Sequence, residues 1–325
     1  MVNSTDRPAA QLHELIDEDE NQHIVILDGH NLIFRTVFIA HEENKKEGTD
    51  DPGYIYWKHV FLSELKTMVE KHKPTRFIIV FDSRVGSWRK NIYPEYKANR
   101  KIARELSKVD FKEFFKVSNP FLEDFKKVFC NLEILQFDGV EGDDIIAVAC
   151  QNFKERITIV STDKDFHQLQ IFKNVKQYEP KKKQMVNVLN PKISLEQKII
   201  GGDKNDNIPG IVPRAGKVKV ASIMSSDLIS NIYDEEYLKE AANVTAIEKK
   251  YKLPPETIKK NLERNTELID FKFIPKDISE NILKVLQNPV KKNFDGRKFM
   301  SFLVEHRMGR LVEKMQDYAE TLGKL

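Results

Sequence analysis

Residues 24–28 read Ile-Val-Ile-Leu-Asp, a short apolar run that ends in an acid. Three further runs, also rich in β-branched residues and phenylalanine, lie at Phe77 to Phe81, Leu132 to Phe137 and Ile157 to Val160. Such runs are typical of buried strands. Helical patterns separate them, for example from Ile55 to Lys71 and from Ile145 to Phe153. Strands that alternate with helices predict an α/β fold with a mostly parallel central sheet flanked by helices.

The chain has 325 residues, a length that suggests two domains. Beyond residue 185 the strand signal fades and helical patterns predominate, at Ser194 to Ile200, Glu235 to Lys250, Pro255 to Asn261, Ser279 to Leu286 and Arg297 to Leu325. We therefore expect an acidic N-terminal tail at residues 1–20, an α/β core at residues 21–185 and a smaller helical domain at residues 186–325.

Charge and cysteine content limit the class of protein. Residues 1–20 hold six acids and one base, so residues 21–325 carry 52 basic and 44 acidic residues, a net charge of +8. Cys130 and Cys150 are the only cysteines and cannot form a disulfide framework or a cysteine zinc site, which predicts a reducing intracellular compartment. No apolar run approaches the ~20 residues that span a bilayer, so we expect no membrane insertion.

Each predicted strand is followed by acids. They are Asp28 after the first strand, Asp82 after the second, Glu141, Asp143 and Asp144 after the third, and Asp163 and Asp165 after the fourth. Ligands of parallel sheets bind at the carboxyl ends of the strands. Seven carboxylates at one edge would repel one another unless cations compensate them, and oxygen ligands favour Mg²⁺ or Mn²⁺ over zinc. Two such ions can assist phosphodiester cleavage.

Taken singly, these acids have ordinary structural alternatives. Asp143 and Asp144 could favour a helix N-terminus, Asp163 could cap a turn, and Asp82 could begin a β-turn. Their joint placement after four strands favours the metal interpretation.

The long insertion after the second strand is basic and aromatic. From Arg84 to Lys116 it holds ten basic and four acidic residues, and Trp88, Tyr93 and Tyr96 are interleaved with the basic residues. This pattern suits contact with phosphates and stacking on unpaired bases. The alternative is a solvated helix face, but the position above the acidic edge favours the first interpretation.

A third pattern, GGDKNDNIPGI at residues 201–211, predicts a tight turn. A purely structural loop would explain its glycines. It would explain less well why Asp203 and Asp206 are followed so soon by Arg214, Lys217 and Lys219.

Six ordered motifs resemble the structure-specific 5′ nucleases, the family that includes flap endonucleases, the 5′-nuclease domain of bacterial DNA polymerase I and bacteriophage enzymes. The motifs are ILDGHNLIFR, FDSRVGSWRK, YPEYKANR, EGDDIIAV, STDKDFHQL and GDKNDNIPGI. The length, the acidic start and the GDKNDN form look most like the bacteriophage members.

The resemblance implies a PIN-like core that binds two Mg²⁺ ions, with Mn²⁺ as an alternative. One ion would be held by Asp28, Asp82, Glu141 and Asp143, and the other by Asp163, Asp165 and Asp206, with Asp144 and Asp203 acting through water. It also implies a helical arch at residues 84–126 and a helix-three-turn-helix after Gly202 that grips duplex DNA. Lys97 and Arg100 would contact the scissile phosphate, and the remaining implied DNA contacts are Arg89, Tyr96, Lys204, Arg214, Lys217 and Lys219.

The implied activity is a Mg²⁺-dependent 5′ to 3′ exonuclease and flap endonuclease acting on DNA and on RNA in RNA–DNA hybrids, with a role in primer removal. The alternatives are a catalytically silent DNA-structure-binding protein, which would have lost acids, and a single-strand ribonuclease of the PIN class, which would lack GDKNDNIPGI. The expected substrates are forked, flapped or nicked duplex DNA and RNA–DNA hybrid.

We expect a monomer in the cytoplasm of the bacterial host. Two protein partners are expected, a single-strand DNA-binding protein and a sliding clamp that would bind residues 11–20. In that segment Leu12, Leu15 and Ile16 share one face of a helical turn, which is a spacing used in helix-in-groove recognition. The alternative for the segment is a disordered acidic tail.

Overall fold

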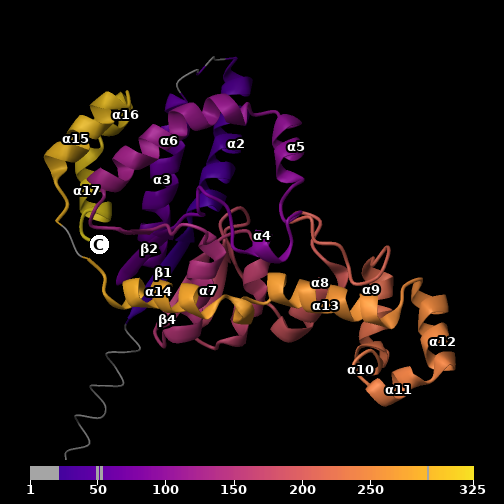
Figure 1. The fold of residues 1–325 in the computed structure, drawn as a ribbon. Helices are drawn as coiled ribbons and strands as arrows, with labels where there is room; N and C mark the ends of the chain where they lie inside the picture. The colour runs from indigo at the N-terminus through magenta and orange to yellow at the C-terminus, as the bar shows by residue number, and fades with distance from the viewer. Residues whose placement is uncertain (1–21, 49–50, 52–53, 291–292) are drawn as a thin grey trace, which may run out of the picture.

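The computed structural model describes residues 22–48, 51, 54–290 and 293–325, and its centre is a six-stranded sheet (Figure 1). The strands are β1 (His23–Asp28), β2 (Arg76–Val80), β3 (Glu133–Leu135), β4 (Arg156–Val160), β5 (Val175–Glu179) and β6 (Gln184–Val186). Their order is β3-β2-β1-β4-β5-β6; β6 pairs antiparallel with β5, and all other pairs are parallel. The predicted mostly parallel sheet is confirmed.

All four apolar runs of the sequence form strands, although β3 is shorter than its run. β5 and β6 were not predicted. In β5 the buried Gln177 interrupts the apolar pattern, and its side-chain nitrogen donates to the backbone carbonyls of Ser161 (3.0 Å) and Asp163 (2.6 Å). The side-chain nitrogen of this buried polar residue is therefore satisfied inside the sheet.

Helices cover both faces of the sheet. Successive side chains of a strand point to opposite faces, and in β1 the side chains on both faces are apolar. In β1, Val25 and Leu27 pack in the cluster that contains α2 (Gly29–Glu47), α3 (Ile55–His72) and α6 (Phe111–Val128). Ile24 and Ile26 pack on the other face with α7 (Gly142–Asn152) and α14 (Lys276–Gln287). A central strand of a parallel sheet is buried on both sides in this way.

The insertion between β2 and β3 forms α4 (Arg89–Ile92), α5 (Arg100–Glu105) and α6. Figure 1 shows that α5 joins α4 to α6. The predicted arch extends to residue 126, but α6 belongs to the core: the Phe114 ring lies 4.8 Å from that of Trp57, and the Phe121 ring lies 5.8 Å from that of Phe61. α5, by contrast, buries no residue.

The second half of the chain is mainly helical, as predicted. Its remaining helices are α8 (Pro191–Gly201), α9 (Lys217–Met224), α10 (Leu228–Asn231), α11 (Glu235–Lys239), α12 (Ala241–Tyr251), α13 (Pro255–Ile269), α15 (Gly296–Glu305), α16 (Gly309–Val312) and α17 (Met315–Leu322), and the 3₁₀ turns are η1 (Asp165–Ile171) and η2 (Phe271–Phe273). Two predicted helices are interrupted. The first breaks at Glu240, which is extended, and the second breaks near Arg307, which has φ 60°.

The hydrophobic clusters divide the chain differently from the boundary expected at residue 185. Residues 195–269 pack in a cluster of their own, which also receives Tyr96. Phe271 and Ile282 pack with α7, while Phe299 and Phe302 pack with α6. The last helices therefore return to the α/β core, as Figure 1 shows. Among the described residues, no helix combines the length and apolar character needed to cross a membrane.

Candidate active site

The acids that follow the strands lie at the carboxyl edge of the sheet. Asp28 ends β1, and its carboxylate accepts hydrogen bonds from the backbone nitrogen of Asn31 (2.9 Å) and the hydroxyl of Ser161 (2.9 Å). Asp82 follows β2 and accepts a hydrogen bond from the backbone nitrogen of Gly142 at 2.8 Å. These bonds hold the two carboxylates at the ends of neighbouring strands.

This edge is a poor place for uncompensated negative charge. Burial, followed by repulsion from Asp163, raises the pKa of Asp143 well above its ordinary value. Burial, together with the charges of Asp82 and Asp163, raises the pKa of Asp28 to about 7. Burial and Asp163 also raise the pKa of Asp165 to about 7. Carboxyl groups that resist ionisation for these reasons can exchange their protons for a bound cation.

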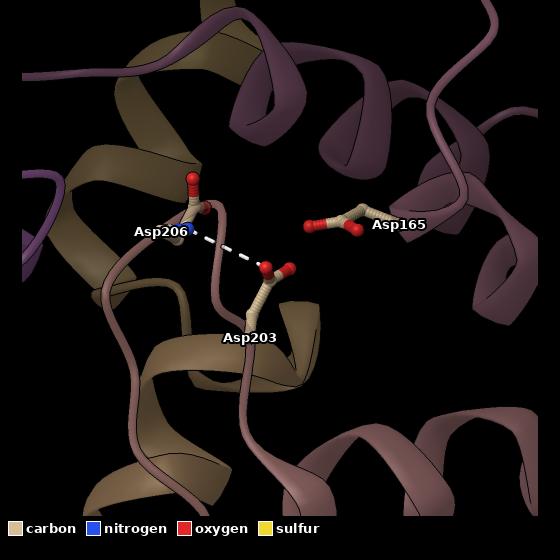
Figure 2. A group of neighbouring side chains, drawn as sticks. All are labelled: Asp165, Asp203 and Asp206. Carbon is tan, nitrogen blue, oxygen red and sulfur yellow. Dashed lines mark hydrogen bonds between the residues drawn. The ribbon is translucent and has the colours of Figure 1, made fainter. Parts of the chain in front are cut away.

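Three acids bring their carboxylates close together (Figure 2). Asp165 begins η1, while Asp203 and Asp206 lie in the loop after α8, and one oxygen of each lies within 4.8 Å of the others. The Asp203 carboxylate accepts a hydrogen bond from the Asp206 backbone nitrogen at 3.4 Å. Gly202 begins the loop with φ 74°, where a Cβ would lie 2.3 Å from the carbonyl oxygen of Ile208. The loop therefore requires glycine at this position.

Within the described part of the chain, no other three acids gather their oxygens this closely. Asp28, Asp82, Glu141 and Asp143 share the edge without forming so tight a group. Asp163 acts electrostatically on both groups of acids. Its charge raises the pKa values of Asp28 and Asp143 in one group and of Asp165 in the other. Asp203, expected to act through water, lies directly beside Asp165 and Asp206.

Two basic side chains reach the acids from the insertion. The ammonium group of Lys97 contacts Glu141 and lies 3.8 Å from Asp206. The guanidinium of Arg100 donates to Asp206 at 2.7 Å. The structure thus brings both residues expected at the scissile phosphate to the acidic edge.

Lys198 is a member of this site that sequence reasoning missed. It lies in the last turn of α8, contacts Asp165 and lies 2.7 Å from Asp203. Although burial opposes it, the charges of these two acids raise the pKa of Lys198. Positive charge is therefore stable between these carboxylates, and their oxygen donors fit a hard divalent cation. The only signal in the sequence was that Lys198 lies a few positions before Asp203 in the chain.

Asp144 and Arg89 require a correction, because each binds the other instead of metal or DNA. Asp144 is fully buried and accepts hydrogen bonds from the Trp88 indole (3.0 Å) and the Arg89 guanidinium (2.8 Å). Arg89 is only 3% exposed and also donates to Glu141 (3.2 Å) and to the carbonyl of Leu268 (2.9 Å). The pair joins the insertion, α7 and the end of α13.

Tyr96 also has a different place from the expected base-stacking position. Its side chain is 3% exposed, and its hydroxyl lies 2.8 Å from the Glu141 carboxylate and 3.1 Å from that of Asp206. The ring packs in the cluster of residues 195–269. Tyr96 therefore positions two acids and has no free face for a base.

A cavity of about 940 Å³ opens beside the acids and is lined by residues of α5 and α6. Asp82, Lys97 and Glu141 contribute to its wall. Seven further basic residues line it, and five of these form no ion pair with a described acid: Lys90, Lys101, Arg104, Lys108 and Lys112. The cavity therefore presents positive charge that the protein itself does not neutralise.

A second basic surface surrounds the connection between α8 and α9. Lys204, Arg214 and Lys217 are exposed, and Lys219 is half-buried with its ammonium group donating to the Pro213 carbonyl at 2.8 Å. Three of these bases line a shallow cavity of about 540 Å³. The structure thus leaves the predicted duplex-binding residues accessible.

Comparisons with known proteins agree with this geometry. The family model "5′-3′ exonuclease, N-terminal resolvase-like domain" matches residues 23–198, and the model "T4 RNase H, C terminal" matches residues 190–318. Ribonuclease H of Enterobacteria phage T4 is 27% identical over 322 residues, which cover 94% of this chain and 99% of that protein. A 5′-3′ exonuclease of Aquifex aeolicus is 27% identical over 307 residues, which cover 87% and 94%.

A solved structure has a similar fold. The bacteriophage T5 flap endonuclease, in a pseudo-enzyme-product complex with DNA and metal ions, superposes with a TM-score of 0.57 and 20% identity over 82% of this chain and 100% of that one. The first family model alone spans more than half of the present chain. We conclude that the chain belongs to the 5′-3′ exonuclease family and is a structure-specific 5′ nuclease.

Proposed function

We propose that this nuclease is a Mg²⁺-dependent 5′ to 3′ exonuclease and flap endonuclease that hydrolyses DNA and the RNA of RNA–DNA hybrids, and that it removes primers during DNA replication. The observation that carries the proposal is an acidic sheet edge flanked by two basic surfaces, a cavity beside α5 and α6 and the exposed bases around α8 and α9. Relatives named ribonuclease H and 5′-3′ exonuclease support it.

The acids would hold two divalent ions. Asp28, Asp82, Glu141 and Asp143 would contribute to one ion, and Asp165, Asp203 and Asp206, with Asp163 nearby, would contribute to the other. Mg²⁺ suits such oxygen donors, and Mn²⁺ can replace it. When bound, these ions would activate water and stabilise the leaving oxygen.

The protein's own side chains would position the substrate. The basic side chains of the cavity that form no ion pair would contact the single strand. Four others would contact the duplex backbone: Lys204, Arg214, Lys217 and Lys219. Lys97 and Arg100 would stabilise the negative charge that develops on the phosphate, because both already lie against the acids.

The decisive experiment uses an end-labelled duplex with a 5′ flap. We expect cleavage near the junction with Mg²⁺, no cleavage with EDTA, and binding without turnover in Ca²⁺, which prefers looser coordination. A duplex that carries a 5′ RNA segment tests primer removal. Binding without any cleavage in Mg²⁺ would indicate a silent structure-binding protein, and cleavage of single strands alone would indicate a single-strand ribonuclease.

Lys97→Ala and Arg100→Ala are each expected to lower the single-turnover rate on the order of 100-fold, with a smaller loss of affinity, because the removed donor acts on developing charge. Rapid-quench cleavage and Ca²⁺ binding assays measure the two quantities. Lys101→Ala is the matched control, since Lys101 lines the same cavity but forms no ion pair with a described acid, and it should change affinity more than rate. Lower affinity with an unchanged rate would make Lys97 and Arg100 simple phosphate anchors.

The surface around α8 and α9 predicts a salt effect. Replacing Lys204, Arg214, Lys217 or Lys219 with alanine should flatten the logarithmic salt dependence of duplex binding by roughly one unit for each phosphate that the variant no longer neutralises. Lys284→Ala on α14 is the control, because this exposed lysine lies outside the surface. If the slope of the salt dependence is unchanged in all four variants, these basic residues form only a solvated surface and do not contact DNA.

Residues 11–20 lie outside the described residues, so their role as a clamp-binding segment stays a prediction from the sequence. We propose that Leu12, Leu15 and Ile16 dock on a sliding clamp, and that a single-strand DNA-binding protein is a further partner. Deletion of residues 1–20 should leave flap cleavage by the free enzyme unchanged and remove stimulation by the clamp. Equal stimulation of the truncated enzyme would disprove the docking.

A further inference from the structure

The loop after α8 is hydrogen-bonded to the part of the insertion that carries Lys97. The side-chain amide of Asn207 donates to the carbonyl of Glu95 at 2.8 Å. The backbone nitrogen of Lys97 itself donates to the carbonyl of Asp206 at 2.9 Å. Glu95 and Asn207 are 112 positions apart in the chain, so the fold brings these two segments together.

A second amide joins the same two segments on the other side of Lys97. The side chain of Asn99 donates to the carbonyl of Lys204 at 2.7 Å. Asn99 directly precedes α5, and Arg100 is the first residue of that helix. The amides of the two asparagines therefore bracket Lys97 and fix the point at which α5 begins.

The backbone at this junction depends on these contacts. Lys97 and Asn207 both have φ 59°, in the left-handed region that residues other than glycine rarely adopt. Tyr96 anchors the preceding backbone in the cluster of residues 195–269, but α5 beyond it buries no residue. Polar contacts with the loop, and not hydrophobic packing, therefore hold the backbone from Lys97 to Arg100.

We propose that Asn207 and Asn99 are positioning residues that aim Lys97 and Arg100 at the phosphate to be cleaved. Their amides fix the insertion relative to the acids of the loop, so that both basic side chains extend from a backbone of constant position. Donors that stabilise developing charge need such preorganisation. This inference rests on the proposed function, since it assumes that Lys97 and Arg100 act on the phosphate.

The test removes each amide in turn. Asn207→Asp keeps the shape of the side chain but cannot donate to the Glu95 carbonyl, and Asn207→Gly removes the side chain while suiting φ 59°. Each should lower the single-turnover rate on a 5′-flapped duplex on the order of tenfold, because small misplacements of reacting groups are costly. Asn99→Ala should have the same effect. Affinity for the duplex in Ca²⁺ should stay close to that of wild type.

Asn205→Asp is the matched control. Asn205 lies in the same loop, but its side chain is exposed and forms no hydrogen bond with a described residue. The control adds the same charge as Asn207→Asp and should cleave as wild type does. In Asn207→Gly and Asn99→Ala, the Mg²⁺ concentration that gives the half-maximal rate should be unchanged, because every carboxylate is kept.

A further comparison separates positioning from a merely structural role. If Asn207 acts through Lys97 and Arg100, Asn207→Gly should cost little more rate in a variant that already carries Lys97→Ala and Arg100→Ala. Hydrogen exchange of the free protein, followed by mass spectrometry, should be faster at residues 95–100 in Asn207→Gly and unchanged in β1. Thermal unfolding establishes that each variant is folded.

Wild-type rates in both Asn207 variants would overturn the inference. So would an equal further loss of rate in the background that lacks Lys97 and Arg100, a higher Mg²⁺ requirement, or unchanged exchange at residues 95–100. Failure of the proposed function is a separate result, namely no cleavage of the flapped duplex by wild type in Mg²⁺. Because hydrogen exchange needs no turnover, it decides the inference in that case as well.

Discussion

Asp165→Asn is expected to reduce cleavage of a flapped duplex to background while binding of the same duplex stays within a few fold of wild type. Asp165 belongs to the group of three carboxylates whose oxygens lie within 4.8 Å, and asparagine keeps its shape but removes its charge. A divalent cation would lose an anionic ligand there. The basic surfaces that bind DNA are unchanged by the substitution. Single-turnover cleavage in Mg²⁺ and binding in Ca²⁺ measure the two effects.

Asp143→Asn tests the other group of acids and should have the same outcome. The matched control is Asp138→Asn, the same change at an exposed aspartate that forms no described contact with the acids, and it should cleave as wild type does. Wild-type rates from Asp143→Asn and Asp165→Asn would contradict the assignment of these carboxylates to metal.

Arg89→Ala is expected to lower the free energy of unfolding by about 3–5 kcal/mol, because removing one partner of a buried ion pair leaves an uncompensated charge. The charge here is that of the fully buried Asp144. Cleavage should fall as well, since Arg89 also donates to Glu141. Urea denaturation measures the free energy.

Arg84→Ala is the matched control, because Arg84 also pairs with a glutamate, Glu123, but with both side chains about half exposed. Exposed pairs contribute about 0–1 kcal/mol, so this variant should unfold nearly as wild type does. The double variant Arg89→Ala with Asp144→Asn should regain part of the stability, because it removes the uncompensated charge. Equal stabilities for Arg84→Ala and Arg89→Ala would show that Asp144 does not depend on the guanidinium.

The predicted fold rested on patterns that are local in sequence. The run from Ile24 to Leu27 is apolar at every position because β1 is buried on both faces, and a strand of this kind can be recognised without its neighbours. β5 could not be recognised in the same way. Its buried Gln177 is stabilised by carbonyls of Ser161 and Asp163, which belong to another part of the chain.

The location of the candidate active site also followed from the sequence. Acids that come directly after parallel strands must lie at one edge of the sheet, so Asp28, Asp82 and Asp165 could be placed there without coordinates. The loop at Gly202 could be predicted for a similar reason, because its glycine and aspartates have strong local preferences.

Tertiary structure alone decided which way the remaining side chains of the site point. Asp144 and Asp143 are adjacent in sequence, yet Asp144 is buried against Arg89 while Asp143 belongs to the acidic edge. Tyr96 turns inward to Glu141 and Asp206, and Lys198 reaches Asp165 from a separate helix. Strand periodicity and turn preference are properties of neighbouring residues, and the sequence determined them. Charge pairing and burial depend on groups brought together from distant parts of the chain, and only the folded structure determines which partner each side chain meets.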